Sequence, residues 1–220
     1  DKMCLPLSVS ETHSQANLKK THDEVLKEIG KITEYLNTLN ENERPEFEGN
    51  LSTAFGCTIE GKVSEKDVVS LGVKMMELGC DEVGLSDTTG YANPTQIKRL
   101  IRLLKKEVGD NNLTSMHLHN TRGLGLANAL ASLEEGIMTL DSSLGGIGGC
   151  PFAPGASGNI VTEDLVFMLD SMGLKTGIDL EALIEVNRIV KTCLPNEELY
   201  GFTIDSGLPK GYSKGGWGTN

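Results

Sequence analysis

Short apolar segments alternate with segments of helical spacing along most of the chain, and this alternation restricts the possible folds more than any other feature. The strand-like segments begin at Leu5, Asn50, Glu82, Thr114 and Met138. The segments between them repeat apolar residues at the three-to-four spacing of amphipathic helices. Because the connections are too short for antiparallel excursions, the strands are expected to form a parallel sheet covered by helices.

The expected fold class is therefore α/β, and two architectures fit it: an open doubly wound sheet, or part of a (β/α)8 TIM barrel. A full barrel needs eight strand–helix units, whereas only five are visible in this sequence. Both architectures place active sites at the carboxyl end of the sheet, where Asp87, His117, His119, Ser142 and Ser143 gather. Helices are expected at 17–39, 64–78, 94–104, 126–133, 161–172 and 179–190.

The composition argues against nucleic-acid and membrane partners. With 20 basic and 31 acidic residues the net charge is -11, which disfavours non-specific nucleic-acid binding. No apolar run approaches the ~20 residues of a membrane span, and the first residues do not resemble a signal peptide. The five cysteines are scattered, odd in number and without a Cys-x-x-Cys pair, which fits a reducing compartment, and the cytoplasm is the expected location.

Two histidines stand two residues apart in the fourth strand-like segment. Because alternate side chains of a strand point the same way, His117 and His119 are expected on one face, with Met116 and Leu118 on the other. Such a pair can bind one cation from a rigid edge, although oxygen-preferring metals need further ligands. The alternative for either histidine alone is a hydrogen-bonded core residue.

A glycine-rich loop follows the fifth strand-like segment and carries Cys150 beside Gly148 and Gly149. A run of glycines can cradle phosphates, but this one lacks the Gly-Lys-Ser/Thr of a P-loop. A lid that closes over a substrate and excludes water is the better physical interpretation. Cys150 itself is either a small buried hydrophobe, as most free cysteines are, or an exposed reactive thiol.

The residues of this loop and its neighbours resemble a known family. Segment 145–166, from Gly-Gly-Ile-Gly-Gly-Cys-Pro onward, closely resembles the signature region of 3-hydroxy-3-methylglutaryl-CoA (HMG-CoA) lyases. Segments 84–90 and 55–62 and the His-x-His strand resemble the same family in order and spacing. The resemblance extends from about residue 5 to about residue 190.

The resemblance implies a (β/α)8 barrel of which strands 4–8 are present, with residues 1–195 forming the C-terminal part of the barrel and 196–220 an extension. It implies cleavage of HMG-CoA to acetyl-CoA and acetoacetate with a divalent cation, Mg²⁺ or Mn²⁺. It also suggests a homodimer or larger homo-oligomer, in the mitochondrial matrix if the source is a eukaryote. The family's Arg-Asp pair after the first strand, and its Glu after the second, have no counterpart here, so we expect the printed chain to be incomplete.

By the same resemblance, His117, His119 and Asn159 are metal ligands. Cys150 is the thiol that protonates the acetyl-CoA enolate, and Asp87 is an active-site residue that orients a base or a ligand. His117 is the favoured general base, although one nitrogen cannot bind a metal and accept a proton at once. Each role has a structural alternative: Asn159 as a helix N-cap and Asp87 as a turn residue.

Three further residues belong to this prediction. Gly148, Gly149 and Glu163 are predicted to bind the substrate or to belong to the loop. The alternative for Glu163 is a carboxylate that only interacts favourably with the helix dipole in the first turn of a helix. Two other readings stay open for the whole chain. One is a metal-dependent 4-hydroxy-2-oxo acid aldolase or an acyl-CoA/2-oxo acid condensing synthase, both of which use a His-x-His strand. The other is a non-catalytic fragment that binds CoA esters.

Overall fold

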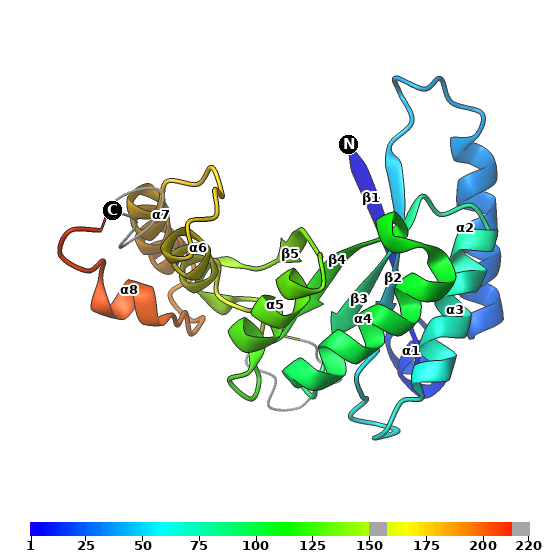
Figure 1. Cartoon of the computed structure of the whole chain (residues 1–220), viewed down its shortest axis with the longest axis horizontal. Coiled ribbons are helices and arrows are strands. Elements are labelled where there is room, and N and C mark those ends of the chain that lie inside the picture. Colours follow the sequence, from blue (N-terminus) through cyan, green and yellow to red (C-terminus); the bar gives the residue numbers. More distant parts are fainter. Residues whose placement is uncertain (150–157, 213–220) are drawn as a thin grey trace. The chain divides into compact units, whose positions relative to one another are not determined.

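Five parallel strands form one sheet in the order in which they occur along the chain (Figure 1). The computed structural model describes residues 1–149 and 158–212. The strands are β1 (Lys2–Ser8), β2 (Glu46–Ser52), β3 (Glu82–Asp87), β4 (Leu113–Leu118) and β5 (Thr139–Asp141). A doubly wound sheet reverses its strand order at a switch point, whereas the wall of a (β/α)8 barrel keeps it. The consecutive order is therefore that of a barrel wall.

Helices follow each strand, as the alternation in the sequence predicts. Their bounds are α1 (Glu11–Asn17), α2 (His22–Leu36), α3 (Glu65–Glu77), α4 (Pro94–Val108), α5 (Gly125–Glu134), α6 (Thr162–Ser171), α7 (Leu180–Cys193) and α8 (Phe202–Ser206), with short 3-10 turns η1 (Asp110–Asn112) and η2 (Leu144–Gly146). Local chemistry sets several of the starts. Asn93 caps α4 in a reciprocal box with Gln96, and Pro94 occupies the first turn.

The expected helix over 17–39 is wrong at its start. Helix α1 already ends at Asn17, and α2 begins only at His22. Between them Lys19 has a φ of 58°, a left-handed conformation that no helix can continue, and Thr21 opens α2 with a capping box to Glu24. Helix α1 is short and polar and has no apolar periodicity, so the pattern that found α2 could not find it.

The two faces of the sheet differ in character. Helices α2 to α5 lie along one face (Figure 1), and the strand residues that point there are apolar and fully buried. They are Leu7, Phe47, Leu51, Val83, Leu85, Met116 and Leu118. The other face is polar. Buried Glu48 on β2 accepts hydrogen bonds from Ser115 Oγ on β4 (2.7 Å) and from its neighbour Asn50 (3.1 Å).

Gly84 on β3 makes this polar arrangement possible. β3 lies between β2 and β4, so Ser115 must reach across it to contact Glu48. A Cβ at position 84 would lie 2.3 Å from both Glu48 Oε1 and Ser115 Oγ. Any side chain there would separate the two groups and leave a buried carboxylate with fewer donors.

The chain divides into two compact units. The first is Asp1–Asp141, with the sheet and helices α1 to α5; in the described residues the second is Ser142–Gly149 and 158–212, with α6 to α8. Within the second, Asp164 of α6 accepts the backbone N–H groups of Phe202 (3.1 Å) and Thr203 (2.7 Å), so the segment after residue 195 is tied to α6. The boundary expected at residue 195 stays a prediction. None of the helices in the described ranges has the length and apolar character needed to cross a membrane.

Candidate active site

His117 on β4 and His119, one residue past the end of that strand, lie on the polar face, as the alternation predicts. Met116 and Leu118 are fully buried toward the opposite, helix-covered face. The His117 and His119 side chains meet instead, with their Nε2 atoms 3.2 Å apart and their rings tilted by 57°. The structure therefore confirms that the pair shares one face, at the carboxyl end of the strand.

The geometry of the pair fits a divalent cation. Two neighbouring ligands of an octahedral ion, each ~2.2 Å from it, lie about 3.1 Å apart, close to the observed Nε2–Nε2 separation of 3.2 Å. Burial, together with the neighbouring His117, lowers the pKa of His119 to about 4, so its imidazole is neutral, the form that binds metals. In the described ranges, no three His, Cys, Asp or Glu side chains converge on one point. Amide, carbonyl and substrate oxygens are further ligands that such an ion accepts.

Asp141 contacts the histidine pair and was not among the residues that the sequence pattern singled out. Its Oδ2 lies 3.2 Å from His117 Nδ1, and the two residues are register partners across β4 and β5. The available signal was a lone carboxylate at the end of the strand that follows the His-x-His strand. Its pairing with His117 depends on the register between two strands, which the sequence pattern did not specify.

Asp87 is buried at the end of β3, next to β4. Its two oxygens accept the backbone N–H groups of Tyr91 (2.9 Å) and Ala92 (3.1 Å), which is the turn role expected as the alternative. Burial raises the pKa of this carboxyl to about 6, although these hydrogen bonds act in the opposite direction. A pKa near neutrality is also typical of groups that transfer protons.

Asp87→Asn is expected to change how stability depends on pH. A carboxyl with a pKa of about 6 when folded and ~3.9 when unfolded stabilises the fold at low pH. This contribution is lost as the pH rises through the folded value. The variant should therefore gain up to ~2 kcal/mol relative to the wild type between about pH 4 and pH 7. Urea unfolding at several pH values measures the difference. His119 gives the opposite pH dependence of stability, but it is present in both proteins and so cancels in the comparison. A stability difference between variant and wild type that stays constant with pH would contradict the raised pKa of Asp87.

In the second unit, Asn159 is held by the glycine-rich segment. Its Nδ2 donates to the carbonyls of Ile147 (2.8 Å) and Gly148 (3.2 Å). Its Oδ1 is buried and, among the described residues, makes no hydrogen bond, as expected of an oxygen reserved for a ligand. The N-cap alternative is wrong, because Val161, two residues further on, occupies the N-cap position of α6. At Gly148 φ is 103°, and a Cβ would lie 2.8 Å from Asn159 Nδ2, so the contact needs glycine.

Glu163 anchors the start of the same segment. It is fully buried in the first turn of α6. Its Oε2 accepts the backbone N–H of Gly145 (3.1 Å), and its Oε1 accepts Asn187 Nδ2 of α7 (2.8 Å). Glu163 therefore has a positioning contact beyond the helix dipole. Gly149 is exposed, and Cys150 lies outside the described residues.

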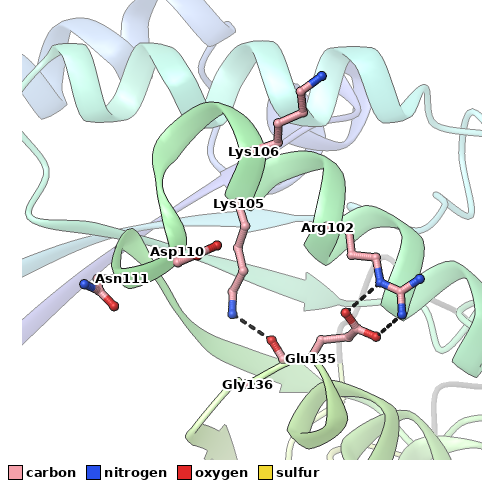
Figure 2. Close-up of a pocket in the computed structure, with 7 residues that line it drawn as sticks. All are labelled: Arg102, Lys105, Lys106, Asp110, Asn111, Glu135 and Gly136. Carbon is pink, nitrogen blue, oxygen red and sulfur yellow. Dashed lines mark hydrogen bonds and ion pairs between the residues drawn. The ribbon is translucent and has the colours of Figure 1, made fainter.

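A polar surface pocket of about 510 Å³ lies apart from the histidines. Figure 2 shows its lining residues, which come from the C-terminal half of α4, η1 and the end of α5. Arg102 forms a two-pronged ion pair with Glu135 (2.6 and 2.7 Å), and Lys105 Nζ donates to the Glu135 carbonyl (2.7 Å). These contacts join α4 to the end of α5.

An in-order parallel sheet with paired imidazoles at the carboxyl end of one strand defines a class: α/β proteins of the TIM-barrel type with a site suited to a divalent cation. The chain belongs to the HMGL-like family, whose family model matches residues 2–190.

Curated proteins similar to this chain have names that describe CoA-ester lyases. Hydroxymethylglutaryl-CoA lyase YngG of Bacillus subtilis is 38% identical over 191 residues, which are 87% of this chain and 62% of the relative. (R)-citramalyl-CoA lyase of Chloroflexus aurantiacus is 43% identical over 180 residues, 82% of this chain and 55% of the relative. A solved HMG-CoA lyase from Acinetobacter baumannii, in complex with coenzyme A and 3-methylmalate, matches with a TM-score of 0.87 and 42% identity over 96% of this chain and 67% of its own. The chain thus spans less than two thirds of the length of both curated relatives.

Proposed function

We propose that the protein is a divalent-cation-dependent lyase that cleaves HMG-CoA to acetyl-CoA and acetoacetate. The observation that carries the proposal is the His117–His119 pair, whose two Nε2 atoms are spaced as neighbouring ligands of one ion. Membership of the HMGL-like family, and the lyase names of its relatives, support the choice of reaction. Residues 1–195 would then belong to the catalytic barrel.

Three residues would hold the cation: His117 and His119 through Nε2, and Asn159 through its unbonded Oδ1. Mg²⁺ or Mn²⁺ in this position would act as a Lewis acid toward the substrate's C3 hydroxyl and carboxylate. Two imidazoles and one amide oxygen leave open positions for substrate oxygens and water in a six-coordinate shell.

The reaction removes one proton from the C3 hydroxyl of the substrate and adds one proton to C2. The C3 hydroxyl loses its proton to a base, the C2–C3 bond breaks, and its electron pair passes to C2 as the thioester enolate. Cys150 then donates its thiol proton to C2, which completes acetyl-CoA and leaves acetoacetate as the ketone. His117 is the proposed base. Where its Nε2 is a ligand, the proton passes through a neighbouring group.

The glycine-rich segment is proposed to close over the substrate. Its start is anchored by Glu163 through the Gly145 N–H, and Gly148 allows close packing on Asn159. Gly149 leads to Cys150, so closure would bring the thiol to the enolate. Excluding water there prevents premature protonation of the enolate by solvent.

Cleavage of citramalyl-CoA is the second candidate function. The citramalyl-CoA lyase of C. aurantiacus is 43% identical to the chain, compared with 38% for the B. subtilis hydroxymethylglutaryl-CoA lyase. The bond broken and the enolate released would be the same, because both substrates carry a hydroxyl and a methyl on C3. The two reactions differ in the product released beside acetyl-CoA. This ketone is acetoacetate from HMG-CoA and pyruvate from citramalyl-CoA.

A direct assay tests both candidates. The natural full-length protein is incubated with HMG-CoA or citramalyl-CoA in excess Mg²⁺ or Mn²⁺, or in EDTA. Acetyl-CoA and the ketone product are quantified. Acetyl-CoA with acetoacetate, lost in EDTA, is the expected result. Pyruvate alone selects the second candidate, and undiminished cleavage in EDTA, or none with either ester, overturns the proposal.

The remaining assignments complete the proposal. The partners are an acyl-CoA substrate and further copies of the chain, in a homodimer or a larger assembly, without nucleic acid or membrane. The location is the cytoplasm, or the mitochondrial matrix in a eukaryote. Hydroxymethylglutaryl-CoA lyases with cytoplasmic and with mitochondrial names are both among the relatives.

A further inference from the structure

The two imidazoles of the pair differ in what holds them. His117 has a partner at each ring nitrogen: Asp141 Oδ2 at 3.2 Å from Nδ1, and His119 Nε2 at 3.2 Å from Nε2. His119 is buried, and its ring meets the backbone of Thr88. His117 therefore has a carboxylate behind it, whereas His119 meets a backbone group.

The contact behind His117 determines where its ring proton resides. An ionised carboxylate only accepts hydrogen bonds, so the proton lies on Nδ1 and points to Asp141. Nε2 then carries its lone pair and points to the space shared with His119. A neutral imidazole with a bare Nε2 is the form that a cation can bind without first displacing a proton.

The placement of Asp141 is built into the sheet. His117 on β4 and Asp141 on β5 are register partners, so their side chains leave neighbouring strands on the same side. A polar contact at this exposure, with 52% of the Asp141 side chain accessible, adds little to folding stability. Stability alone therefore does not account for the arrangement.

We propose that Asp141 is a positioning residue that keeps His117 in the Nδ1-protonated tautomer, so that Nε2 is ready to bind the divalent cation. The inference rests on the proposed function, because it assumes that the pair binds a cation. It adds a carboxylate–histidine contact behind one ligand, a contact that in metal sites orients the ring and raises its basicity.

Asp141→Asn is the informative variant. An amide can donate its N–H to His117 Nδ1, which would move the ring proton to Nε2 and block the ligand position. Mn²⁺ affinity, measured by calorimetry with the metal alone, should fall about 10- to 100-fold. Asp141→Glu keeps a carboxylate and should recover part of the affinity.

The tautomer is observed separately, in EDTA, by two-bond ¹H–¹⁵N spectra of histidine-labelled protein. The wild type should show His117 protonated at Nδ1, and Asp141→Asn should show a shift toward Nε2. Asp110→Asn is the matched control, since it removes the same charge from η1, before the amino end of β4. It should change neither measurement.

The outcomes separate the two proposals. If the wild type binds no Mn²⁺, the cation-dependent function falls, while the tautomer spectra still test the role of Asp141. If the wild type binds Mn²⁺ and Asp141→Asn binds it equally well, or if His117 keeps the same tautomer in the variant, the positioning role is overturned and the proposed function stands.

Discussion

Cys150→Ser is expected to cut turnover of HMG-CoA by a factor on the order of 10²–10⁴, the usual contribution of one positioned acid–base group. The thiol, with a reference pKa of ~8.5, protonates an enolate far more readily than a serine hydroxyl does. Affinity for Mn²⁺ should be unchanged, because the proposed ligands are His117, His119 and Asn159. Steady-state release of acetyl-CoA, together with Mn²⁺ titration of the same samples, measures both effects.

Cys193→Ser is the matched control for this variant. Cys193 is an exposed free cysteine at the end of α7, so its replacement should leave turnover and metal affinity as they are. Full activity in Cys150→Ser would remove the thiol from the mechanism. The lyase assignment would then give way to the aldolase or condensing-synthase alternative.

His119→Ala is expected to weaken Mn²⁺ binding by at least about 100-fold, more than a change to a residue behind a ligand usually costs. One of the two nitrogens that meet at 3.2 Å is removed, and alanine supplies no replacement. Excess Mn²⁺ should restore part of the turnover, because mass action can refill a weakened site while Cys150 is intact. Calorimetry and a turnover titration with Mn²⁺ test these expectations.

His22→Ala provides the comparison. His22 lies at the start of α2, where its Nε2 pairs with the Ser8 carbonyl at 2.8 Å, outside the His117–His119 pair. Its loss should not alter Mn²⁺ affinity. Wild-type affinity in His119→Ala would mean that the pair is not the cation site, whatever the reaction proves to be.

Features that depend on near neighbours in the sequence were predictable. The shared face of His117 and His119 follows from the two-residue repeat of a strand, and the structure confirms it. The parallel α/β sheet likewise follows from alternating periodicities, although only the consecutive strand order distinguished a barrel wall from a doubly wound sheet. These predictions needed no knowledge of which strands pair.

Features that depend on pairing or on backbone geometry were not predictable in the same way. Asp141 meets His117 only because β4 and β5 pair in one register. The break before α2 depends on a left-handed Lys19, a residue with no special preference for that conformation. Asn159 suits a helix N-cap by residue type, but its amide instead bonds to the carbonyls of Ile147 and Gly148, twelve and eleven residues earlier.

The polar face of the sheet has a consequence for how the chain selects one structure among its alternatives. Glu48 draws hydrogen bonds from β2 itself and, past the bare Gly84, from Ser115 on β4. If β3 or β4 slipped by a single position, side chains would change faces and this buried carboxylate would lose the hydrogen bond from Ser115, while Asn50 and Lys2 would still donate to it. The buried carboxylate of Glu48 therefore destabilises a misaligned sheet more than it stabilises the correctly aligned one.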